Sequence, residues 1–467
     1  MKLDGLAVCV AGLGVSGPPA ARVLAARGAH VTVVDGRDDA ERRSVAAELE
    51  SPHIKIILGC RADAIPPGTE LVVTSPGWRP DAPLLLAARG AGIPIIGDVE
   101  LAWRLRPVLP DGRRQAWLAV TGTNGKTTTV KMLAAMLAAS GRRAIAAGNV
   151  GTSLAAVVTD PEPYPVLAVE LSSFQLHWSA TLRPFAAVVL NVAADHLDWH
   201  PSLDSYARDK GRIFAAGTIA ICNADDAWST RLASAAAGQA AIGFTLGVPG
   251  AGQLGVADGM LTDRAFCPPG ESAKLAAVAD VRPPAPHNVA NALAAAALAR
   301  AYGVQPAAVR EGLRAFEPDP HRISLVGRVR GVDYVDDSKA TNPHAAAASL
   351  AAYPVVVWVA GGLLKGADVD DLVAGAAGRL RAAVLLGTDR AKIRQALARH
   401  APNVPVAEVD GTDTEVMDHV VTEAAALARP GDTVLLAPAA ASLDMFSSYR
   451  ARGDAFATAV RKLAAAP

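Results

Sequence analysis

The stretch Ala119-Val-Thr-Gly-Thr-Asn-Gly-Lys-Thr-Thr128 has the composition of a turn that joins a strand to a helix and wraps a phosphate group. Gly122 and Gly125 allow backbone N–H groups to point into the turn, and Lys126 can reach the β- and γ-phosphates of a nucleotide. The first glycine of a Walker A loop would fall at position 120, where this chain has valine. Gly-Lys-Thr between a strand and a helix still predicts a phosphate loop, because a buried lysine needs an anionic partner.

The length and composition of the chain predict a multidomain α/β protein. Its 467 residues correspond to about three domains at roughly 150 residues per domain. Hydrophobic residues make up 51% of the chain and aromatic residues only 4%, as in doubly wound proteins built from Val-rich strands and Ala-rich helices. Basic and acidic residues number 45 each, so net charge favours neither nucleic acid nor a membrane surface. A small-molecule partner is expected.

The cysteines and the apolar segments indicate a cytoplasmic protein. The four cysteines are scattered and form no C-x-x-C pair, which argues against a zinc ribbon and a disulfide framework. The apolar segment 6–10 follows Asp4 and precedes a glycine-rich turn, so it reads as a first strand rather than a signal peptide. The longest uncharged run, 232–257, is interrupted by Gly, Pro and Gln and does not resemble a membrane span. We expect a cytoplasmic monomer without a membrane partner.

The N-terminal segment resembles a dinucleotide-binding unit. Gly12-Leu-Gly-Val-Ser-Gly17 lies between an apolar strand and a helix, and the next strand ends at Asp35. Such glycines let the backbone approach a diphosphate at a helix N-terminus. One alternative is a dehydrogenase that binds NAD here, and another is a glycine turn that only packs a strand against a helix. A segment rich in Pro, Gly and Arg, 105–114, is predicted to end this unit.

Polar residues follow two predicted strands of the second unit. The strand 166–170 ends in Glu170, and the strand 188–191 is followed by Asp195-His196-Leu-Asp198. Because ligands bind at the carboxyl ends of parallel strands, Glu170, His196 and Thr127 are predicted to surround one metal–phosphate cluster. Taken singly, His196 is equally compatible with an ordinary hydrogen-bonded histidine.

A proline-marked junction, Glu317-Pro-Asp-Pro-His-Arg322, begins a third alternating unit. Its predicted strands are 332–336, 355–360, 383–386 and 433–437. The predicted fold is therefore α/β with three domains. These are a Rossmann-like domain over residues 1–110, a central domain of the P-loop ATPase type over 111–318, and a second Rossmann-like domain over 319–467.

Six motifs in order along the chain resemble the Mur ligases, a family of ATP-dependent amide-forming enzymes of peptidoglycan precursor assembly. They are Thr121-Gly-Thr-Asn-Gly-Lys-Thr-Thr128, Gly148-Asn-Val-Gly151, Glu170-Leu-Ser-Ser-Phe-Gln175, Asp195-His-Leu-Asp198, His287-Asn-Val-Ala-Asn291 and Asp337-Ser-Lys-Ala-Thr-Asn342. The resemblance spans essentially the whole chain. It is closest to the members that add D-glutamate, through Gly12–Gly17 and Pro438-Ala-Ala-Ala-Ser-Leu-Asp-Met-Phe446. The Asp-Asn-Pro-Arg motif of the diaminopimelate-adding relative is absent from the sequence.

The resemblance implies a specific reaction. The carboxylate of UDP-N-acetylmuramoyl-L-alanine would attack the γ-phosphorus of ATP, and the amine of D-glutamate would then displace phosphate from the acyl phosphate. ATP and two Mg²⁺ ions are the implied cofactors. Three alternatives stay open: a Mur ligase that adds a different amino acid, a nucleotide-gated binding protein without catalysis, and the NAD-dependent dehydrogenase.

The resemblance also assigns residues to sites. The ATP site would comprise Gly122, Thr123, Asn124, Gly125, Lys126, Thr127, Thr128, Asn288, Asn291, Arg322 and Asp337. The UDP-substrate site would comprise Gly14, Val15, Ser16, Asp35, Ser75, Gly77, Asn149 and Ser172. The amino-acid site would comprise Lys339, Thr341, Lys365, Ser442 and Tyr449. The catalytic residues would be Lys126, His196 and Lys210, and the metal ligands Thr127, Glu170, His196 and Lys210.

Lys210 matches the lysine that relatives modify with CO₂. An ammonium group would repel Mg²⁺, whereas a carbamate reverses the charge and offers two oxygen ligands. The alternative is a solvent-facing helix lysine. The chain departs from the family pattern at Leu363-Leu364, at Tyr449 and at Asp209, which precedes Lys210 where a small residue is usual. Adjacent helix residues diverge by about 100°, so Asp209 is expected to point away from the site.

Overall fold

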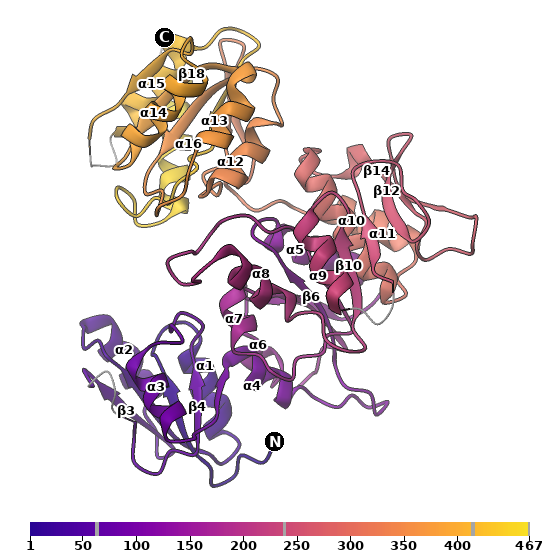
Figure 1. The fold of residues 1–467 in the computed structure, drawn as a ribbon, viewed down its shortest axis with the longest axis vertical. Coiled ribbons are helices and arrows are strands. Elements are labelled where there is room, and N and C mark those ends of the chain that lie inside the picture. The colour runs from indigo at the N-terminus through magenta and orange to yellow at the C-terminus, as the bar shows by residue number, and fades with distance from the viewer. Residues whose placement is uncertain (61–64, 237–239, 412–415, 466–467) are drawn as a thin grey trace. The chain divides into compact units, whose positions relative to one another are not determined.

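The computed structural model describes residues 1–60, 65–236, 240–411 and 416–465. Three separate β-sheets with flanking helices account for most of them (Figure 1). The fold is α/β, as the sequence predicts. Alternate residues of central strands pack into different hydrophobic clusters: in strand β1 (Ala7–Ala11), Val8 and Val10 belong to one cluster, and Cys9 and Ala11 to another. Both faces of the sheet are therefore buried, which explains the continuous apolar runs in the sequence.

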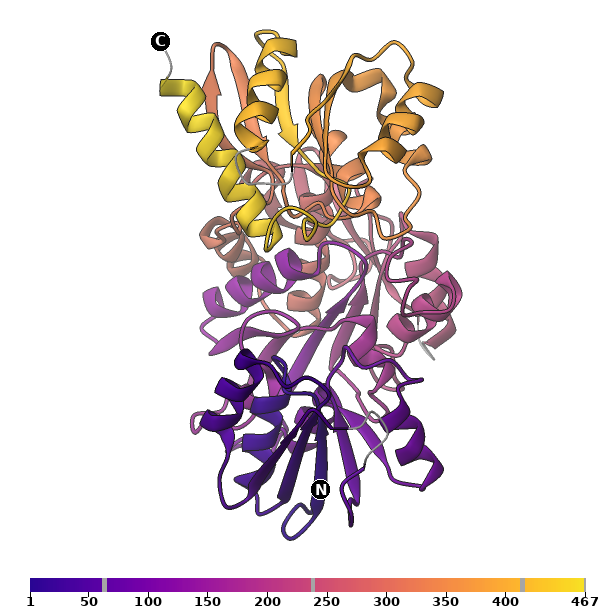
Figure 2. The same ribbon diagram turned by 90° about the vertical axis from the view of Figure 1, so that its left-hand side faces the viewer.

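The first sheet has five parallel strands in the order β3-β2-β1-β4-β5, which run side by side in the lower part of Figure 2. The other strands are β2 (His30–Asp35), β3 (Ile54–Leu58), β4 (Leu71–Thr74) and β5 (Ile95–Gly97). The helices are α1 (Gly17–Ala25), α2 (Ala40–Leu49), α3 (Pro83–Gly90) and α4 (Asp98–Leu105). The glycine-rich turn lies between β1 and α1, at the carboxyl edge of the sheet.

The second sheet has nine strands in the order β14-β13-β12-β11-β10-β9-β6-β8-β7. They are β6 (Ala116–Thr121), β7 (Ala144–Gly148), β8 (Val166–Glu170), β9 (Ala186–Val189), β10 (Ile219–Asn223), β11 (Ile242–Phe244), β12 (Gln253–Ala257), β13 (Met260–Asp263) and β14 (Ala273–Ala277). Its helices are α5 (Lys126–Ala139), α6 (Leu154–Val157), α7 (Ser173–His177), α8 (Leu203–Gly211), α9 (Ala227–Ala236), the 3₁₀ helix η1 (Val278–Asp280), α10 (Pro286–Ala301) and α11 (Pro306–Ala315). The last three strands pair antiparallel, which the sequence interpretation did not anticipate.

The third sheet has six strands in the order β15-β16-β20-β17-β18-β19, and only β15 and β16 pair antiparallel. The strands are β15 (Ser324–Val329), β16 (Val332–Asp336), β17 (Val356–Gly361), β18 (Leu380–Leu386), β19 (Val406–Glu408) and β20 (Thr433–Leu436). The helices are α12 (Pro343–Leu350), α13 (Asp370–Ala376), the 3₁₀ helix η2 (Ala377–Arg379), α14 (Arg390–His400), α15 (Val416–Leu427) and α16 (Tyr449–Ala465). The adjacent strands β16, β20 and β17 place their carboxyl ends at one edge.

The chain divides into two compact units. The first comprises Met1–Val192, Trp199–Val281 and Val289–Phe316, and the second comprises Ala193–Asp198, Arg282–Asn288 and Glu317–Pro467. The first unit contains both the five-stranded and the nine-stranded sheet. The boundaries of the three domains expected from the sequence stay predictions.

A buried carboxylate joins the first two sheets. Glu100 of α4 is completely buried, and its Oε2 accepts hydrogen bonds of 3.0 Å from the backbone amides of Ala180 and Thr181. Its Oε1 accepts from the Thr181 hydroxyl at 2.6 Å and from Arg104 Nε at 2.8 Å. Because the buried charge is hydrogen-bonded on both oxygens, this junction is fixed by polar contacts as well as by packing.

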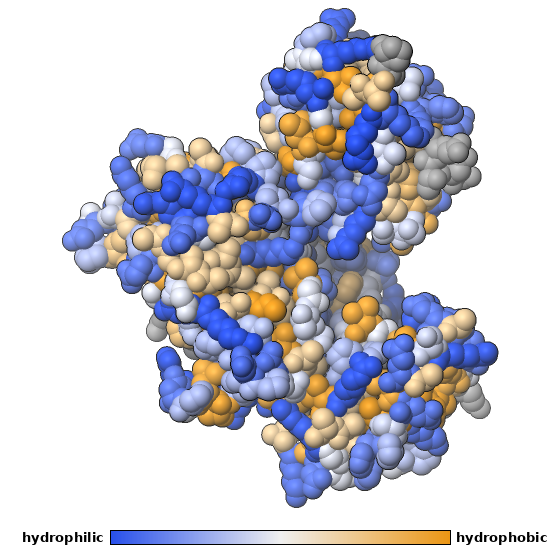
Figure 3. Space-filling view, turned by 180° about the vertical axis from the view of Figure 1, so that it is seen from behind, coloured by the Kyte–Doolittle hydropathy of each residue, from blue (hydrophilic) through white to orange (hydrophobic). Residues whose placement is uncertain are grey.

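The surface carries scattered apolar side chains. On the face shown in Figure 3, hydrophobic and hydrophilic residues are intermixed. The most exposed large hydrophobic side chains are Val15, Val248, Leu443 and Leu325, which belong to different segments. Within the described ranges, no helix has both the length and the hydropathy needed to cross a membrane.

Candidate functional site

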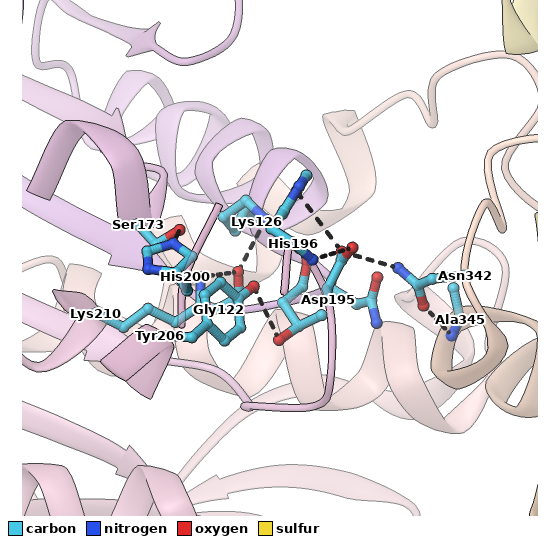
Figure 4. A network of polar contacts seen from close by, with 12 residues as sticks. Gly122, Lys126, Ser173, Asp195, His196, His200, Tyr206, Lys210, Asn342 and Ala345 are labelled. Carbon is cyan, nitrogen blue, oxygen red and sulfur yellow. Dashed lines mark hydrogen bonds and ion pairs between the residues drawn. The ribbon is translucent and has the colours of Figure 1, made fainter. Parts of the chain in front are cut away.

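The phosphate loop connects β6 to α5 with the geometry expected from its glycines. Gly125 has φ +86°, and a Cβ atom there would lie 2.2 Å from Asn291 Oδ1, so only glycine fits. Helix α5 begins directly afterwards at Lys126. Lys126 Nζ donates hydrogen bonds of 2.9 Å to the carbonyl oxygens of both Gly122 and Thr123 (Figure 4). The lysine therefore lies folded over its own loop.

Asn191, which follows strand β9, holds the loop from the adjacent strand. Its Oδ1 accepts from the Asn124 amide at 2.9 Å, and its Nδ2 donates to the Asn124 carbonyl at 3.2 Å. The Thr123 amide also donates to the Asn191 carbonyl at 3.0 Å. These three bonds fix the turn before any ligand binds, which reduces the entropy lost when phosphates are bound.

Glu170, the last residue of β8, is a buried carboxylate that contacts the first turn of the helix after the phosphate loop. It is 2% exposed, and its Oε2 accepts from the Thr127 hydroxyl at 2.8 Å. Its Oε1 accepts from Asn149 Nδ2 at 3.0 Å. A hydroxyl and a carboxylate in contact offer the hard oxygen donors that Mg²⁺ prefers, so this pair fits the predicted metal site. In the part of the chain that the structure describes, no cluster of three or more His, Cys, Asp or Glu side chains could hold a metal by itself.

Lys210 of α8 is buried beneath the loop, which contradicts the alternative of a solvent-facing lysine. It is 1% exposed, its Nζ donates to the Gly122 carbonyl at 2.8 Å, and it lies 4.4 Å from the centroid of the Tyr206 ring. Gly122 O therefore accepts from Lys126 and from Lys210 (Figure 4). The Tyr206 hydroxyl lies 3.3 Å from Thr123 Oγ1. Two cationic side chains thus converge on one turn, where phosphate oxygens would relieve their mutual repulsion.

Asp209 faces away from the loop, as expected of a helix neighbour of Lys210. Its Oδ2 lies 2.9 Å from His177 Nδ1 and 3.4 Å from His200 Nδ1, and its Oδ1 lies 3.0 Å from Arg212 Nε. Burial alone would raise the pKa of Asp209, but hydrogen bonds with His177 and His200 and the charges of His177 and Arg212 lower it to about 2. His200 Nε2 in turn lies 2.9 Å from Ser173 Oγ. The cluster joins α8 to α7.

A cavity of about 520 Å³ lies at the carboxyl edge of the first sheet. Three of the predicted UDP-substrate residues line it: Gly14, Asp35 and Ser75. The other lining residues are Gly12, Gly36, Arg37, Arg42, Cys60, Trp78, Pro83 and Leu84. Gly12 has φ +98°, and a Cβ there would lie 2.8 Å from Trp78 Nε1. The volume falls in the range of small-molecule sites.

Asp35 organises the wall of this cavity. Its Oδ2 accepts from the Leu13 amide at 2.8 Å, and its Oδ1 accepts from the Arg37 amide at 2.9 Å. Arg42 Nε lies 3.5 Å from Oδ2. The carboxylate therefore fixes the glycine-rich turn relative to the segment after β2.

The remaining predicted UDP-substrate residues do not line this cavity. Val15 is 93% exposed, and neither Val15, Ser16 nor Gly77 is among the residues that line the cavity. Ser172 caps α7, where its Oγ accepts from the Gln175 amide at 3.2 Å. Asn149 contacts Glu170, as described above. The roles of these residues stay predictions.

Asn288 and Asn291, two of the predicted ATP-site residues, lie one turn apart on α10. Asn288 Nδ2 donates to the Pro283 carbonyl at 3.2 Å, and Asn291 packs against Gly125. A spacing of three residues places both side chains on one face of the helix. Asn288 belongs to the second compact unit and Asn291 to the first.

Asp337, another predicted ATP-site residue, follows β16. Burial raises the pKa of Asp337 to about 6, although a hydrogen bond from Ser349 and the charge of Arg322 oppose this. Ser349 Oγ donates to Asp337 Oδ2 in a short hydrogen bond. Arg322 Nε lies 3.6 Å from Asp319 Oδ2. Asp337 is thus held at the end of β16, and its protonation depends on burial and on its interactions with Ser349 and Arg322.

His196 lies in the short segment 193–198 that belongs to the second compact unit. It has φ +54°, and its Nε2 lies 3.8 Å from Asp195 Oδ2. Asp195 Oδ2 also accepts from Asn342 Nδ2 at 3.5 Å (Figure 4). The metal role of His196 stays a prediction, because Glu170 and Lys210 belong to the first unit.

The predicted amino-acid residues follow three adjacent strands of the third sheet. Lys339 and Thr341 follow β16, Lys365 follows β17, and Ser442 follows β20. Lys339 Nζ lies 4.4 Å from the centroid of the ring of Tyr449, the first residue of α16. Lys365 is exposed with φ +51°, and Ser442 is buried. Basic and hydroxyl side chains at one sheet edge suit an anionic amino acid.

Sequence reasoning missed several residues of these sites. Asn191 was seen only as the last residue of a predicted strand, and Tyr206 and His200 were assigned to no site. Asn191 and Tyr206 contact the phosphate loop, and His200 contacts Ser173. For Asn191, its position at the end of the predicted strand 188–191 was a usable signal. Tyr206 lies four residues before Lys210, a spacing that places both on one face of a helix.

Comparison with known proteins assigns the whole chain to one family. The model of the "Mur ligase MurD-like, N-terminal domain" matches residues 7–97, that of the "Mur ligase middle domain" 120–299, and that of the "Mur ligase, glutamate ligase domain" 321–440. The UDP-N-acetylmuramoylalanine--D-glutamate ligase of Thermobifida fusca is 61% identical, over 99% of this chain and 100% of the relative. The protein of the same name from Mycolicibacterium smegmatis is 50% identical, over 98% of this chain and 97% of the relative.

Solved structures share the fold at low identity. UDP-N-acetylmuramate-alanine ligase MurC from Thermotoga maritima superposes with a TM-score of 0.58 at 19% identity, covering 98% of this chain and 100% of that one. The MurF ligase from the same organism, in complex with ADP, has a TM-score of 0.57 at 16% identity and covers 99% of this chain and 96% of that one. The structural likeness shows the fold, and the family models and close relatives show the family. The chain belongs to the Mur ligases.

Proposed function

We propose that this protein is an ATP-dependent ligase that adds D-glutamate to UDP-N-acetylmuramoyl-L-alanine in peptidoglycan precursor synthesis. The phosphate loop of the second sheet would bind ATP, and the cavity at the first sheet would bind the UDP part of the substrate. The edge of the third sheet that carries Lys339, Thr341, Lys365 and Ser442 would bind D-glutamate. We further propose that it acts in the cytoplasm as a monomer.

The reaction has two steps. An oxygen of the substrate carboxylate attacks the γ-phosphorus of ATP, a new P–O bond forms, and ADP leaves. The amine of D-glutamate then attacks the acyl carbon, the C–O bond breaks, and phosphate leaves with the carboxylate oxygen while the amine loses a proton. Both steps develop negative charge on phosphate oxygens and require no protein nucleophile.

The residues around Gly122 suit this chemistry. Lys126 and Lys210 already share the Gly122 carbonyl, so Lys126 can turn from the carbonyl to the γ-phosphate when ATP binds. Mg²⁺ bound to the phosphates would neutralise part of their charge and orient the acyl phosphate. Thr127, Glu170, His196 and a carbamylated Lys210 would hold two such ions.

The observation that carries the proposal is the convergence of Lys126, Lys210 and the Thr127–Glu170 pair on one buried turn. A phosphate loop that binds only a nucleotide needs the first lysine and the hydroxyl, but not a second buried lysine beneath the same carbonyl. The names of the close relatives support D-glutamate as the acceptor.

The proposal is tested by ADP release with UDP-N-acetylmuramoyl-L-alanine, ATP and a panel of amino acids. We expect ADP release that requires both the UDP substrate and D-glutamate. Comparable turnover with L-alanine or a diamino acid, and none with D-glutamate, would favour another Mur ligase specificity. Nucleotide binding without substrate-dependent ADP release would indicate a non-catalytic binding protein. The dehydrogenase alternative explains neither the phosphate loop nor Glu170.

A further inference from the structure

Helix α16 carries a buried arginine that serves none of the sites described above. Arg452 is 1% exposed. Its Nε donates to Ser338 Oγ at 3.0 Å and its Nη2 to the Ser338 carbonyl at 2.9 Å. Its Nη1 donates to the Ala440 carbonyl at 3.1 Å and to the Gly361 carbonyl at 3.4 Å. One planar guanidinium group therefore binds three backbone segments.

Each of these segments follows a different strand at the same edge of the third sheet. Ser338 follows β16, Gly361 ends β17, and Ala440 follows β20, and β16, β20 and β17 are adjacent parallel strands. The side chains proposed to bind D-glutamate lie one to four residues further on. Lys339 and Thr341 follow Ser338, Lys365 follows Gly361, and Ser442 follows Ala440. Arg452 thus hydrogen-bonds to each of the three segments that carry Lys339, Thr341, Lys365 and Ser442.

Other contacts fix the helix that carries the arginine. The Ser338 hydroxyl donates to the Tyr449 carbonyl at 2.7 Å, so the same serine contacts the first turn of α16 twice. A Cβ at Gly453 would lie 2.2 Å from His321 Nδ1 and 2.7 Å from Asp336 Oδ2, so the helix packs closely on that pair. The guanidinium is therefore positioned by the Ser338 contacts and by the close packing of α16 against His321 and Asp336.

The hydrogen bonds of the Arg452 guanidinium go to neutral acceptors. All four are accepted by the Ser338 hydroxyl or by the carbonyl oxygens of Ser338, Gly361 and Ala440. Burial lowers the pKa of Arg452 to about 10, although the charges of Asp444 and Asp336 oppose this. A buried cation that is satisfied mainly by carbonyls is costly compared with an apolar side chain of similar size. Packing alone therefore gives no reason for arginine at this position.

We propose that Arg452 is a positioning residue that holds the three segments in register and thereby shapes the D-glutamate site. This inference rests on the proposed function, because the assignment of Lys339, Thr341, Lys365 and Ser442 to D-glutamate comes from it. The guanidinium offers five N–H donors in a rigid plane, which matches acceptors on three segments at once. A lysine ammonium keeps the charge but has no such fork.

The first test compares Arg452→Lys with the unsubstituted enzyme and with Arg461→Lys. Arg461 is an exposed arginine on the same helix whose Nη2 contacts Thr458. We expect Arg452→Lys to raise the KM for D-glutamate by roughly tenfold or more, which corresponds to the loss of about one hydrogen bond to a charged group. The KM values for ATP and the UDP substrate should change less than about twofold. Arg461→Lys should change none of the three.

A second measurement does not depend on catalysis. Amide hydrogen exchange reports whether the three segments loosen together, through the Lys339 amide, which donates to the His321 carbonyl, and through the paired amides of Leu363 and Ala441. Exchange in all three segments should accelerate in Arg452→Lys and not in Arg461→Lys. Ser338→Ala removes one acceptor of the guanidinium together with the hydrogen bond to the Tyr449 carbonyl, and leaves the other three hydrogen bonds of Arg452 in place. It should raise the KM for D-glutamate by a smaller factor.

Two results would overturn the inference. One is an equal rise in KM for all three substrates, which would mean a general loss of structure. The other is that, in both Arg452→Lys and Ser338→Ala, either the amide exchange rates of the three segments or the KM for D-glutamate stay unchanged. Failure of the proposed function is seen separately, because the unsubstituted enzyme would then not use D-glutamate at all.

Discussion

Replacing Asp209 by asparagine should weaken the contact between α7 and α8 in a pH-dependent way. The pKa of Asp209 falls from 3.8 to about 2 in the folded protein. At about 1.36 kcal/mol per pKa unit, the ionised carboxylate contributes about 2 kcal/mol to stability. Because the folded pKa is the lower one, this contribution is fully present above pH 3.8 and is lost as the pH falls toward 2. Asparagine keeps the shape of the side chain but removes the charge.

The matched control is Asp204→Asn on the same helix. Asp204 has a side chain that is 70% exposed and lies 3.4 Å from Arg231 Nη2, so its loss should cost less than about 0.5 kcal/mol. A protein of several domains does not unfold in one step, so the assay is amide hydrogen exchange of α7 and α8. At pH 7 exchange in Asp209→Asn should be roughly 30-fold faster than in the parent.

The ratio of exchange rates between variant and parent should shrink steadily from pH 4 toward pH 2. Each ratio is taken at one pH, which removes the pH dependence of the intrinsic exchange rate. A ratio near one at pH 7, or a ratio that does not change on acidification, would refute the assignment of a stabilising carboxylate to this cluster.

Three further substitutions separate the proposed sites. Lys126→Ala should abolish turnover but leave the affinity for the UDP substrate within about twofold in calorimetric titration, and a folded variant that loses both affinities would contradict this. Gly12→Ala should raise the KM for the UDP substrate by roughly tenfold without changing the KM for ATP. The left-handed backbone conformation of Gly12 costs about 1–2 kcal/mol for a residue with a Cβ atom, and this Cβ would also meet Trp78. An unchanged KM for the UDP substrate would argue against this cavity as the UDP site. Lys210→Ala should be inactive and recover partly with short carboxylic acids, whereas full activity in bicarbonate-depleted buffer would show that no carbamate is needed.

Much of the fold was predictable because its signals are local. Gly125 and Lys126 lie within one turn, and the strands before them are apolar on both faces, so the sequence alone indicated a phosphate loop in an α/β sheet. The antiparallel strands β12, β13 and β14 were missed. They are only four or five residues long, and alternation between apolar and polar residues cannot be recognised over so few positions.

The missed parts of the site depend on contacts between distant residues. Lys210 and Gly122 are 88 positions apart, so no periodicity indicates that two lysines share one carbonyl. The acceptors of Arg452 likewise lie on three segments that only the strand order brings together. The resemblance to Mur ligases identified Lys210 without this geometry, and the structure explains why that lysine is buried. Arg452 matched no motif used in the sequence interpretation.

The most direct test of the central claim follows an oxygen atom. UDP-N-acetylmuramoyl-L-alanine labelled with ¹⁸O in its carboxylate is incubated with ATP and D-glutamate, and the released phosphate is examined by mass spectrometry. Ligation through an acyl phosphate predicts that each phosphate carries one oxygen from the substrate carboxylate, and that an amide product forms with D-glutamate. Unlabelled phosphate, or labelled phosphate with no D-glutamate product, would contradict the proposed reaction.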